Sequence, residues 1–314
     1  MAYVDNFGYG VDGASYAPTT YEELGDAIGK VAKQIIRDVG AVNPMERFDK
    51  GMIENGDTIE TAVVKLVEAQ GYDKTGANAL SRDTTSKLAV RYFNKWQRHT
   101  YKTTVDIQEL RKILLNGGEG SQAVAERLVG ALGASAMDDR FQAYKRLIKW
   151  GTTTASWSDN TNPIFIKSAD VKVDANGNTQ YKAILKQIKD IVKGMQFVNT
   201  NYNRFGLKRK TLESDIIIVM PYKLKNAIDV DELAGVFNLS KAEIANKIIE
   251  IDTDDKIVYV LDQNAVLHYV RLYEMAQQKN ASGLFYNYFL HVEDMYGLSP
   301  LFDATFFNYD VPNK

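Results

Sequence analysis

Acid–base and metal chemistry need histidines or carboxylates at particular spacings, and this sequence offers few of them. The chain has three histidines, His99, His268 and His291. No two of them have the His-x-x-x-His spacing of a helical metal site, and each falls in a strand-like stretch. The carboxylate pairs Asp138-Asp139 and Asp254-Asp255 could serve acid–base catalysis. We interpret the histidines as ordinary strand residues and the carboxylates as solvated surface.

Other catalytic and cofactor signatures are also missing from the sequence. The chain has no cysteine, which excludes disulfides, a thiolate zinc site and a cysteine nucleophile. It has neither a Gly-x-Ser-x-Gly elbow nor a Gly-Lys-Ser/Thr phosphate loop. Residues 174–178 faintly resemble a calcium loop but lack the terminal glutamate of that motif. We therefore expect no catalytic residue, no cofactor and no metal ion.

Positive charge is concentrated at one place in the chain. The cluster consists of Arg204, Lys208, Arg209 and Lys210. Such a run can contact nucleic acid or an acidic partner, or it can be a solvated loop, and the sequence leaves these alternatives open. The formal net charge of −2 argues against a chain that grips nucleic acid over its whole surface.

The size and composition indicate an ordinary globular protein. A chain of 314 residues, 45% hydrophobic and 25% charged, can form one large domain or two modest ones. No stretch approaches the roughly 20 apolar residues that a membrane span needs, and the first residues do not resemble an export signal. We expect no membrane partner. The 18 tyrosines suit surfaces that become buried on assembly, although half-exposed core positions explain them equally well.

The first third of the chain predicts an arm, a helix and an extended ribbon. Residues 1–18 have no periodicity, and a helix is expected over 20–40. Two short strands within 48–63 flank Asn55-Gly56, which predicts a hairpin. Further strands follow in alternating stretches at 88–92 and 101–105, with a bend near Phe93 and Trp96 and a loose tip at 71–86. A two-stranded ribbon is marginal alone, so we expect a second subunit to cover it.

The remainder predicts a mixed α+β fold. Residues 119–150 have the spacing of one long helix, and 181–197 predict a second one with an apolar face. That face consists of Ile184, Ile188, Ile191, Val192 and Met195. The continuously apolar stretch at 215–221 predicts a strand buried on both sides. A hairpin is expected around 175–178, short helices at 222–228, 233–236 and 240–248, and strands at 248–251, 257–261, 266–273, 283–292 and 304–309.

Four segments resemble the major head proteins of phi-twenty-nine-like phages, which are small short-tailed viruses. They are residues 43–51 with 56–60 and 70–73, residues 91–106, residues 228–238 and residues 283–292. The order of elements also resembles the tailed-phage major capsid fold. That resemblance implies an N-terminal arm and helix (1–44), an extended β-loop (45–110), a peripheral domain with a spine helix (111–182), an axial domain (183–265) and return strands of the peripheral domain (266–314).

The resemblance implies a shell protein that assembles into the hexamers and pentamers of an icosahedral head around a DNA genome. Its implied partners are further copies of itself, a scaffolding protein, a portal protein and packaged DNA. It would be made in the host cytoplasm and end in the virion. The inter-subunit contacts expected on the ribbon and its base are Phe48, Ile59, Tyr72, Tyr92, Trp96, Arg98 and Tyr101.

Two other classes of protein remain as alternatives. An encapsulin-type nanocompartment would share the fold but enclose a cellular enzyme and assemble without a scaffold. A hydrolase of unassigned type would need a cleft lined by carboxylates with perturbed pKa values. Closed shells that depend on a scaffold would favour the phage protein over the nanocompartment.

Overall fold

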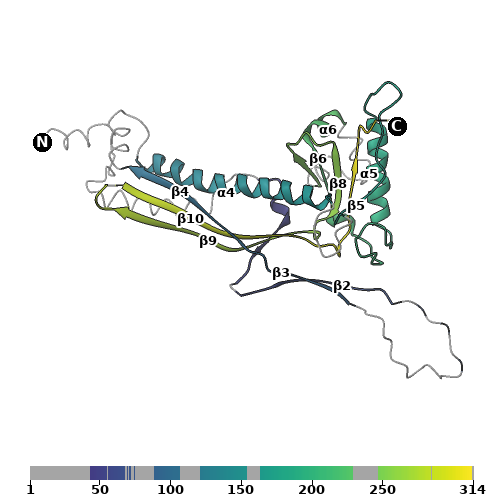
Figure 1. The fold of residues 1–314 in the computed structure, drawn as a ribbon, viewed down its shortest axis with the longest axis horizontal. Helices are drawn as coiled ribbons and strands as arrows, with labels where there is room; N and C mark the ends of the chain where they lie inside the picture. The colour runs from purple at the N-terminus through teal and green to yellow at the C-terminus, as the bar shows by residue number, and fades with distance from the viewer. Residues whose placement is uncertain are drawn as a thin grey trace.

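A computed structural model describes residues 43–54, 56–67, 69, 71, 74, 88–106, 121–153, 163–228, 247–283 and 285–312. The arm and helix expected before residue 41, most of the ribbon tip, Tyr72 and all of 229–246 lie outside these residues. The described part mixes helices and strands, as the α+β expectation requires. It contains a five-stranded sheet, a long four-stranded sheet and a two-stranded ribbon (Figure 1).

The five-stranded sheet has the order β5-β11-β8-β6-β7. Its strands are β5 (Ile166–Lys167), β6 (Ile216–Pro221), β7 (Ile248–Ile251), β8 (Ile257–Asp262) and β11 (Ala304–Asn308). Every residue of β6 is buried, which confirms the prediction of a strand covered on both faces. Residues 183–265 were expected to form the axial domain. Two strands of this sheet, β5 and β11, lie outside that range.

Helices cover the two faces of this sheet. Helix α5 (Tyr181–Met195) packs on one face through the five apolar residues that the sequence predicted. The short helix α6 (Tyr222–Ala227) directly follows β6 and adds Leu224 to the same core. On the other face, a second core includes Tyr144 and Ile148 from the end of the long helix α4 (Ser121–Gly151). Short 3₁₀ turns at Glu46–Phe48 and Glu213–Asp215 precede β1 and β6.

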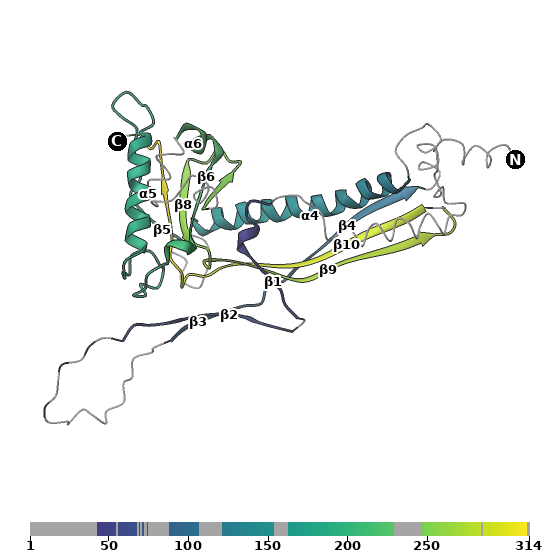
Figure 2. The ribbon, with the colours of Figure 1, turned by 180° about the vertical axis from the view of Figure 1, so that it is seen from behind.

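The four-stranded sheet runs alongside α4 (Figures 1 and 2). Its order is β1-β9-β10-β4, with β1 (Asp49–Met52), β4 (Gln97–Asp106), β9 (Val266–Asn280) and β10 (Phe285–Leu298). Strands β9 and β10 are longer than predicted because they continue as an antiparallel pair beyond the five-stranded sheet. The predicted long helix is confirmed, and its 31 residues correspond to about 46 Å. Leu132 and Ala136 of α4 pack on Tyr288 and Leu290 of β10.

The ribbon consists of β2 (Ile59–Val64) and β3 (Leu88–Phe93), and it projects away from α4 (Figure 1). The hairpin predicted at Asn55-Gly56 is wrong: β1 pairs in parallel with β9, whereas β2 pairs with β3. Gly56 nevertheless has the positive φ of 99° that its turn needs. Residues Asn94–Trp96 interrupt the strand between β3 and β4, where a bend was expected. After this interruption, β4 pairs with β10 and is no longer part of the ribbon.

The hairpin predicted around 175–178 is also wrong, although the turn exists. Asp174 closes that turn by accepting hydrogen bonds from the backbone N–H groups of Asn176 and Asn178, both at 2.8 Å. The preceding residues pair elsewhere: the N–H groups of Val171 and Val173 donate to the carbonyls of Asn308 and Val311. The prediction of the turn was therefore correct, but the residues before it pair with a segment more than a hundred positions away.

Candidate subunit-contact surfaces

The exposed large hydrophobic residues of the described chain divide into two sets. Six lie between residues 52 and 92: Met52, Val64, Leu66, Val67, Leu88 and Tyr92. The other six lie between 181 and 222: Tyr181, Phe197, Val198, Phe205, Leu212 and Tyr222. Grouped exposed apolar side chains are typical of surfaces that bind another molecule. The first set belongs mainly to the ribbon, and the second centres on residues 196–212, which we call the 196–212 loop.

The ribbon presents an apolar face to solvent. Side chains that lie directly opposite each other on paired strands share a face. On one face, Ile59 lies opposite Phe93, and both are buried. The other face pairs Glu60 with Tyr92, Ala62 with Val90, and Val64 with Leu88. Val64 is 73% exposed and Tyr92 63% exposed, so this second face lacks a cover within the described residues.

The ribbon is attached to the long sheet through its base. Ile59 and Phe93 pack on Leu267 of β9 and Met295 of β10. The Thr61 hydroxyl lies 3.2 Å from that of Ser299, just beyond β10. At Gly297, a Cβ would lie 2.9 Å from Cδ1 of Phe93, so the ring occupies the space that the glycine leaves. The base is fixed, whereas the apolar face beyond it is open.

The residues predicted as inter-subunit contacts have different environments. Phe48 is fully buried against Tyr144 at a ring-centroid distance of 5.8 Å, and Ile59 is buried at the ribbon base. Both predictions are corrected, because these side chains serve the chain's own core and leave no surface for a partner. Tyr92 remains exposed, and Tyr72 lies outside the described residues.

The other three predicted contacts are partly accessible: Arg98 and Tyr101 belong to β4, and Trp96 directly precedes it. The Arg271 guanidinium lies over the half-buried Trp96 ring, 4.5 Å from its centroid. The exposed Arg98 forms an ion pair with Glu293 at 3.2 Å. The Tyr101 hydroxyl donates to Asp139 of α4 at 2.8 Å. Burial and this carboxylate both raise the pKa of Tyr101 above its usual range.

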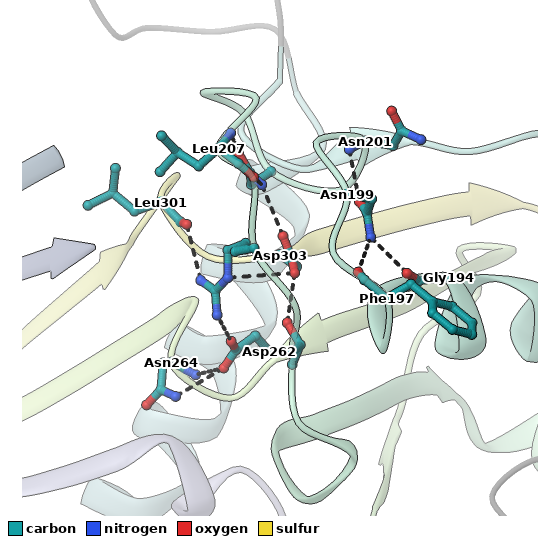
Figure 3. A network of polar contacts seen from close by, with 12 residues as sticks. Gly194, Phe197, Asn199, Asn201, Leu207, Asp262, Asn264, Leu301 and Asp303 are labelled. Carbon is teal, nitrogen blue, oxygen red and sulfur yellow. Dashed lines mark hydrogen bonds and ion pairs between the residues drawn. The ribbon is translucent and has the colours of Figure 1, made fainter. Parts of the chain in front are cut away.

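The 196–212 loop is held by a network of polar contacts (Figure 3). The buried Asn203 donates to the Leu207 carbonyl at 2.8 Å and accepts from the Leu207 N–H at 2.6 Å. The buried carboxylate of Asp303 accepts from Asn203 at 3.1 Å and from the Thr211 hydroxyl at 2.7 Å. At the start of the loop, the Asn199 amide donates to the carbonyls of Gly194 and Phe197.

Arg209, which the sequence analysis named as a contact for nucleic acid or an acidic partner, belongs to this network. Its guanidinium donates to Asp262 at 2.8 Å and to the Leu301 carbonyl at 3.1 Å, and it lies 3.7 Å from Asp303. Burial raises the pKa of Asp262 in spite of this positive partner. The same prediction also named Arg204, Lys208 and Lys210. Of these, Lys208 and Lys210 are exposed and Arg204 is half-buried.

A buried charge cluster joins four elements at the end of the long sheet where β1 pairs with β9. His268 of β9 is 1% exposed, and its two ring nitrogens lie 3.5 Å from Asp49 of β1 and from Asp294 of β10. Its ring stacks on Tyr296 at 4.7 Å and meets the edge of Tyr144 from α4. The sequence identified His268 as a strand residue but gave no sign of its partners, which lie up to 219 positions away.

The hydrolase alternative requires a cleft lined by carboxylates with perturbed pKa values. A cleft of about 500 Å³ lies beside this cluster, between α4, β4 and β10. The Asp294 carboxylate on its wall accepts two hydrogen bonds from Arg140, at 3.2 and 3.1 Å. Burial alone would raise the pKa of Asp294, but His268 and Arg140 lower it below the usual range. A general acid needs the opposite shift, so this carboxylate serves an ion pair and gives no support to a hydrolase.

The described residues offer no candidate for a metal site or a membrane-spanning helix. They contain no group of three or more His, Asp or Glu side chains placed to hold a metal ion. None of the helices among them is both long and apolar enough to cross a membrane. Two exposed apolar surfaces of the described residues therefore have no assigned role, the ribbon face and the 196–212 loop.

Comparison with solved structures establishes the class of protein to which this fold belongs. The capsid structure of Staphylococcus phage Andhra matches with a TM-score of 0.64 at 12% identity, over 85% of this chain and 84% of that one. The capsid structure of cyanophage P-SCSP1u matches with a TM-score of 0.52 at 12% identity, over 85% and 87% of the two chains. The chain has the tailed-phage major capsid fold, as the sequence analysis expected.

The sequence narrows this class to one family. Residues 4–308 match the family model of the Phi29-like phage major capsid protein, and the chain belongs to that family. It is 27% identical to the major capsid protein of Bacillus phage GA-1 over 97% of this chain, and 20% identical to that of Streptococcus phage Cp-1 over 90%. The chain spans 63% of the length of the GA-1 relative and 80% of the Cp-1 relative.

Proposed function

We propose that this chain is the shell subunit of a phage head and self-assembles into the hexamers and pentamers of an icosahedral capsid around the DNA genome. Membership of the major capsid family supports the proposal, and the apolar face of the ribbon is the observation in the structure that carries it. A projecting two-stranded ribbon with an exposed apolar face is costly for a monomer and useful for a subunit.

The physical role of the ribbon follows from its two ends. Its base is held in the chain's own core by Ile59 and Phe93, so its direction is fixed before assembly. Its open face carries Val64, Leu88 and Tyr92, which can be buried only by another molecule or by residues outside the described part. Because each contact is repeated around the shell, modest contact energies add up to a stable particle.

The remaining parts of the proposal rest on the family rather than on a particular contact. The expected partners are a scaffolding protein, a portal protein and packaged DNA, in addition to further copies of the chain. Assembly would take place in the host cytoplasm and leave the protein in the virion. The proposal keeps the arm, extended-loop, peripheral and axial divisions as expectations, and it assigns β5 and β11 to the axial sheet because they pair within it. A structural shell subunit needs no catalytic residue, cofactor or metal.

The proposal is tested by electron microscopy of the purified chain, alone and co-expressed with a candidate scaffold. We expect closed shells, and we expect the double variant Leu88→Gln/Tyr92→Ser to raise the concentration needed for assembly by about tenfold or more, because apolar contact area is lost. The control is Leu88→Val/Tyr92→Phe, which keeps the face apolar and should assemble like the wild type. Wild-type protein that stays monomeric under both conditions would refute the proposed function.

A further inference from the structure

The 196–212 loop combines a rigid interior with an apolar exterior. Asn203, Arg209 and Asp303 tie it internally and to the five-stranded sheet. Its main chain is also pinned, since the N–H of Thr211 donates to the Met195 carbonyl and that of Ala304 donates to the Tyr202 carbonyl, at 2.8 and 2.9 Å. A loop ordered in this way loses little conformational freedom when it binds, which favours tight contact.

The exposed side chains of this loop are those of a binding surface. Phe197 is 71% exposed and Phe205 56% exposed, and Val198 and Leu212 are exposed with them. Gly206, at a φ of 58°, makes the turn that leaves Phe205 outside while Leu207 is buried. Aromatic residues in an ordered surface are frequent energetic centres of protein interfaces.

The charge of the loop indicates what it binds. The chain has 38 basic and 40 acidic residues; the loop contains four of the basic residues and no acidic one, so the rest of the chain carries a formal net charge of −6. Arg209 is neutralised internally by Asp262 and Asp303. Lys208 and Lys210 are both exposed. The loop is therefore complementary to the remainder of a second copy.

The same charges exclude one arrangement of two copies. A twofold contact that places one 196–212 loop against another would bring like charges together. A contact between the loop and a different surface of the neighbour avoids this repulsion. Such heterologous contacts close into rings, which is the symmetry that hexamers and pentamers require.

We propose that the 196–212 loop is a heterologous subunit contact that docks on a negatively charged surface of a second copy of this chain. This inference rests on the proposed function and identifies one of its contacts, separate from the ribbon. A DNA-facing role explains the lysines but not Val198 and Leu212, because aliphatic side chains do not stack on bases as aromatic rings do.

Two pairs of substitutions test the inference in the full chain. Phe197→Ser/Phe205→Ser removes the apolar contact, and Lys208→Glu/Lys210→Glu reverses the charge. The charge control is Lys182→Glu/Lys189→Glu, which makes the same change of net charge at exposed positions on α5. Circular dichroism checks that each variant is folded, while light scattering and sedimentation velocity measure the concentration at which it assembles.

We expect the apolar pair to raise that concentration by about tenfold or more, and the loop charge reversal to raise it more strongly at low salt than at high salt. The α5 control should stay within about twofold of the wild type. Loop variants that assemble like the wild type would overturn the inference while leaving the shell function intact. Normal assembly with impaired DNA retention would assign the loop to DNA instead. Wild-type protein that never self-associates would overturn both proposals.

Discussion

At the scale of single residues, His268 is a buried titratable group that lies between two carboxylates. Burial disfavours its charged form, but Asp294 and Asp49 outweigh that effect and raise the pKa of His268 above 6.5. The same contacts lower the pKa values of Asp49 and Asp294. Arg140 lies against Asp294, and the Tyr144 and Tyr296 rings enclose the imidazole. In its protonated form, His268 therefore bridges the carboxylates of β1 and β10.

The pKa of His268 predicts how stability depends on pH. A raised pKa means that the protonated imidazole contributes stability fully below about pH 6.5, and that this contribution is lost as pH rises through the folded-state value. We expect the free energy of unfolding to fall as pH rises from about 6.5 through the folded-state pKa, by roughly 1.4 kcal/mol for each unit by which the pKa is raised. Urea unfolding across this range measures it.

Two variants distinguish the contribution of His268 to this pH dependence from that of other titrating groups. His268→Gln removes the titrating group and should flatten the decrease in stability over that range. His99→Gln changes an exposed histidine of β4 and should leave the decrease as in the wild type. An unchanged pH dependence in His268→Gln would show that another group is responsible.

The residues that sequence patterns identified correctly are those whose environment is set by their own element. The five buried positions of α5 follow from helical periodicity alone. Phe48 and Arg209 were assigned to partners because nothing near them in sequence shows Tyr144, Asp262 or Asp303. Those contacts are created by the fold, and a single sequence does not reveal them.

At the scale of elements, the attachment of the ribbon depends on a glycine of β10. Gly297→Ala would place a methyl group 2.9 Å from the Phe93 ring. Because Phe93 is buried at the ribbon base, we expect this overpacking to lower the free energy of unfolding by about 1 to 3 kcal/mol. Chemical denaturation measures the change.

A second glycine supplies the matched control. Gly130 lies in α4, and a Cβ there would meet nothing within 4 Å. Gly130→Ala should therefore raise the free energy of unfolding by up to about 1 kcal/mol, through helix propensity alone. Equal effects of the two substitutions would show that Phe93 moves aside freely and does not fix the ribbon.

Strand existence was easier to predict than strand pairing. Alternation and apolar runs located β2, β3, β4 and β6. The hairpin expected at Asn55-Gly56 failed because β1 and β2 pair with different strands. The hairpin expected around 175–178 failed because its turn connects a segment bonded to residues 308–311 with helix α5. Those partners are selected by the burial of side chains in the two large sheets, and the residues of a local turn do not indicate which strands will pair.

At the scale of the whole molecule, the structure divides into a well-covered region and a region that needs neighbours. The five-stranded sheet has a core on each face, and its strand β6 is entirely buried. Beyond Val270, the outer edge of β9 has no strand partner among the described residues, and most of residues 274–279 are exposed. The ribbon extends further from any core. Stability should therefore fall from the five-stranded sheet outward.

Amide hydrogen exchange tests this gradient and its connection with assembly. In the unassembled chain, we expect the slowest exchange in β6 and β8, and much faster exchange in β2, β3 and the distal half of β9. In assembled shells, the amides of β2 and β3 should exchange at least about tenfold more slowly, because a neighbouring subunit then covers the ribbon and opposes its opening. The exchange of β6 should change little, since its surroundings are already complete in one chain. Equal ribbon exchange before and after assembly would mean that the exposed face of Val64, Leu88 and Tyr92 is not where subunits meet.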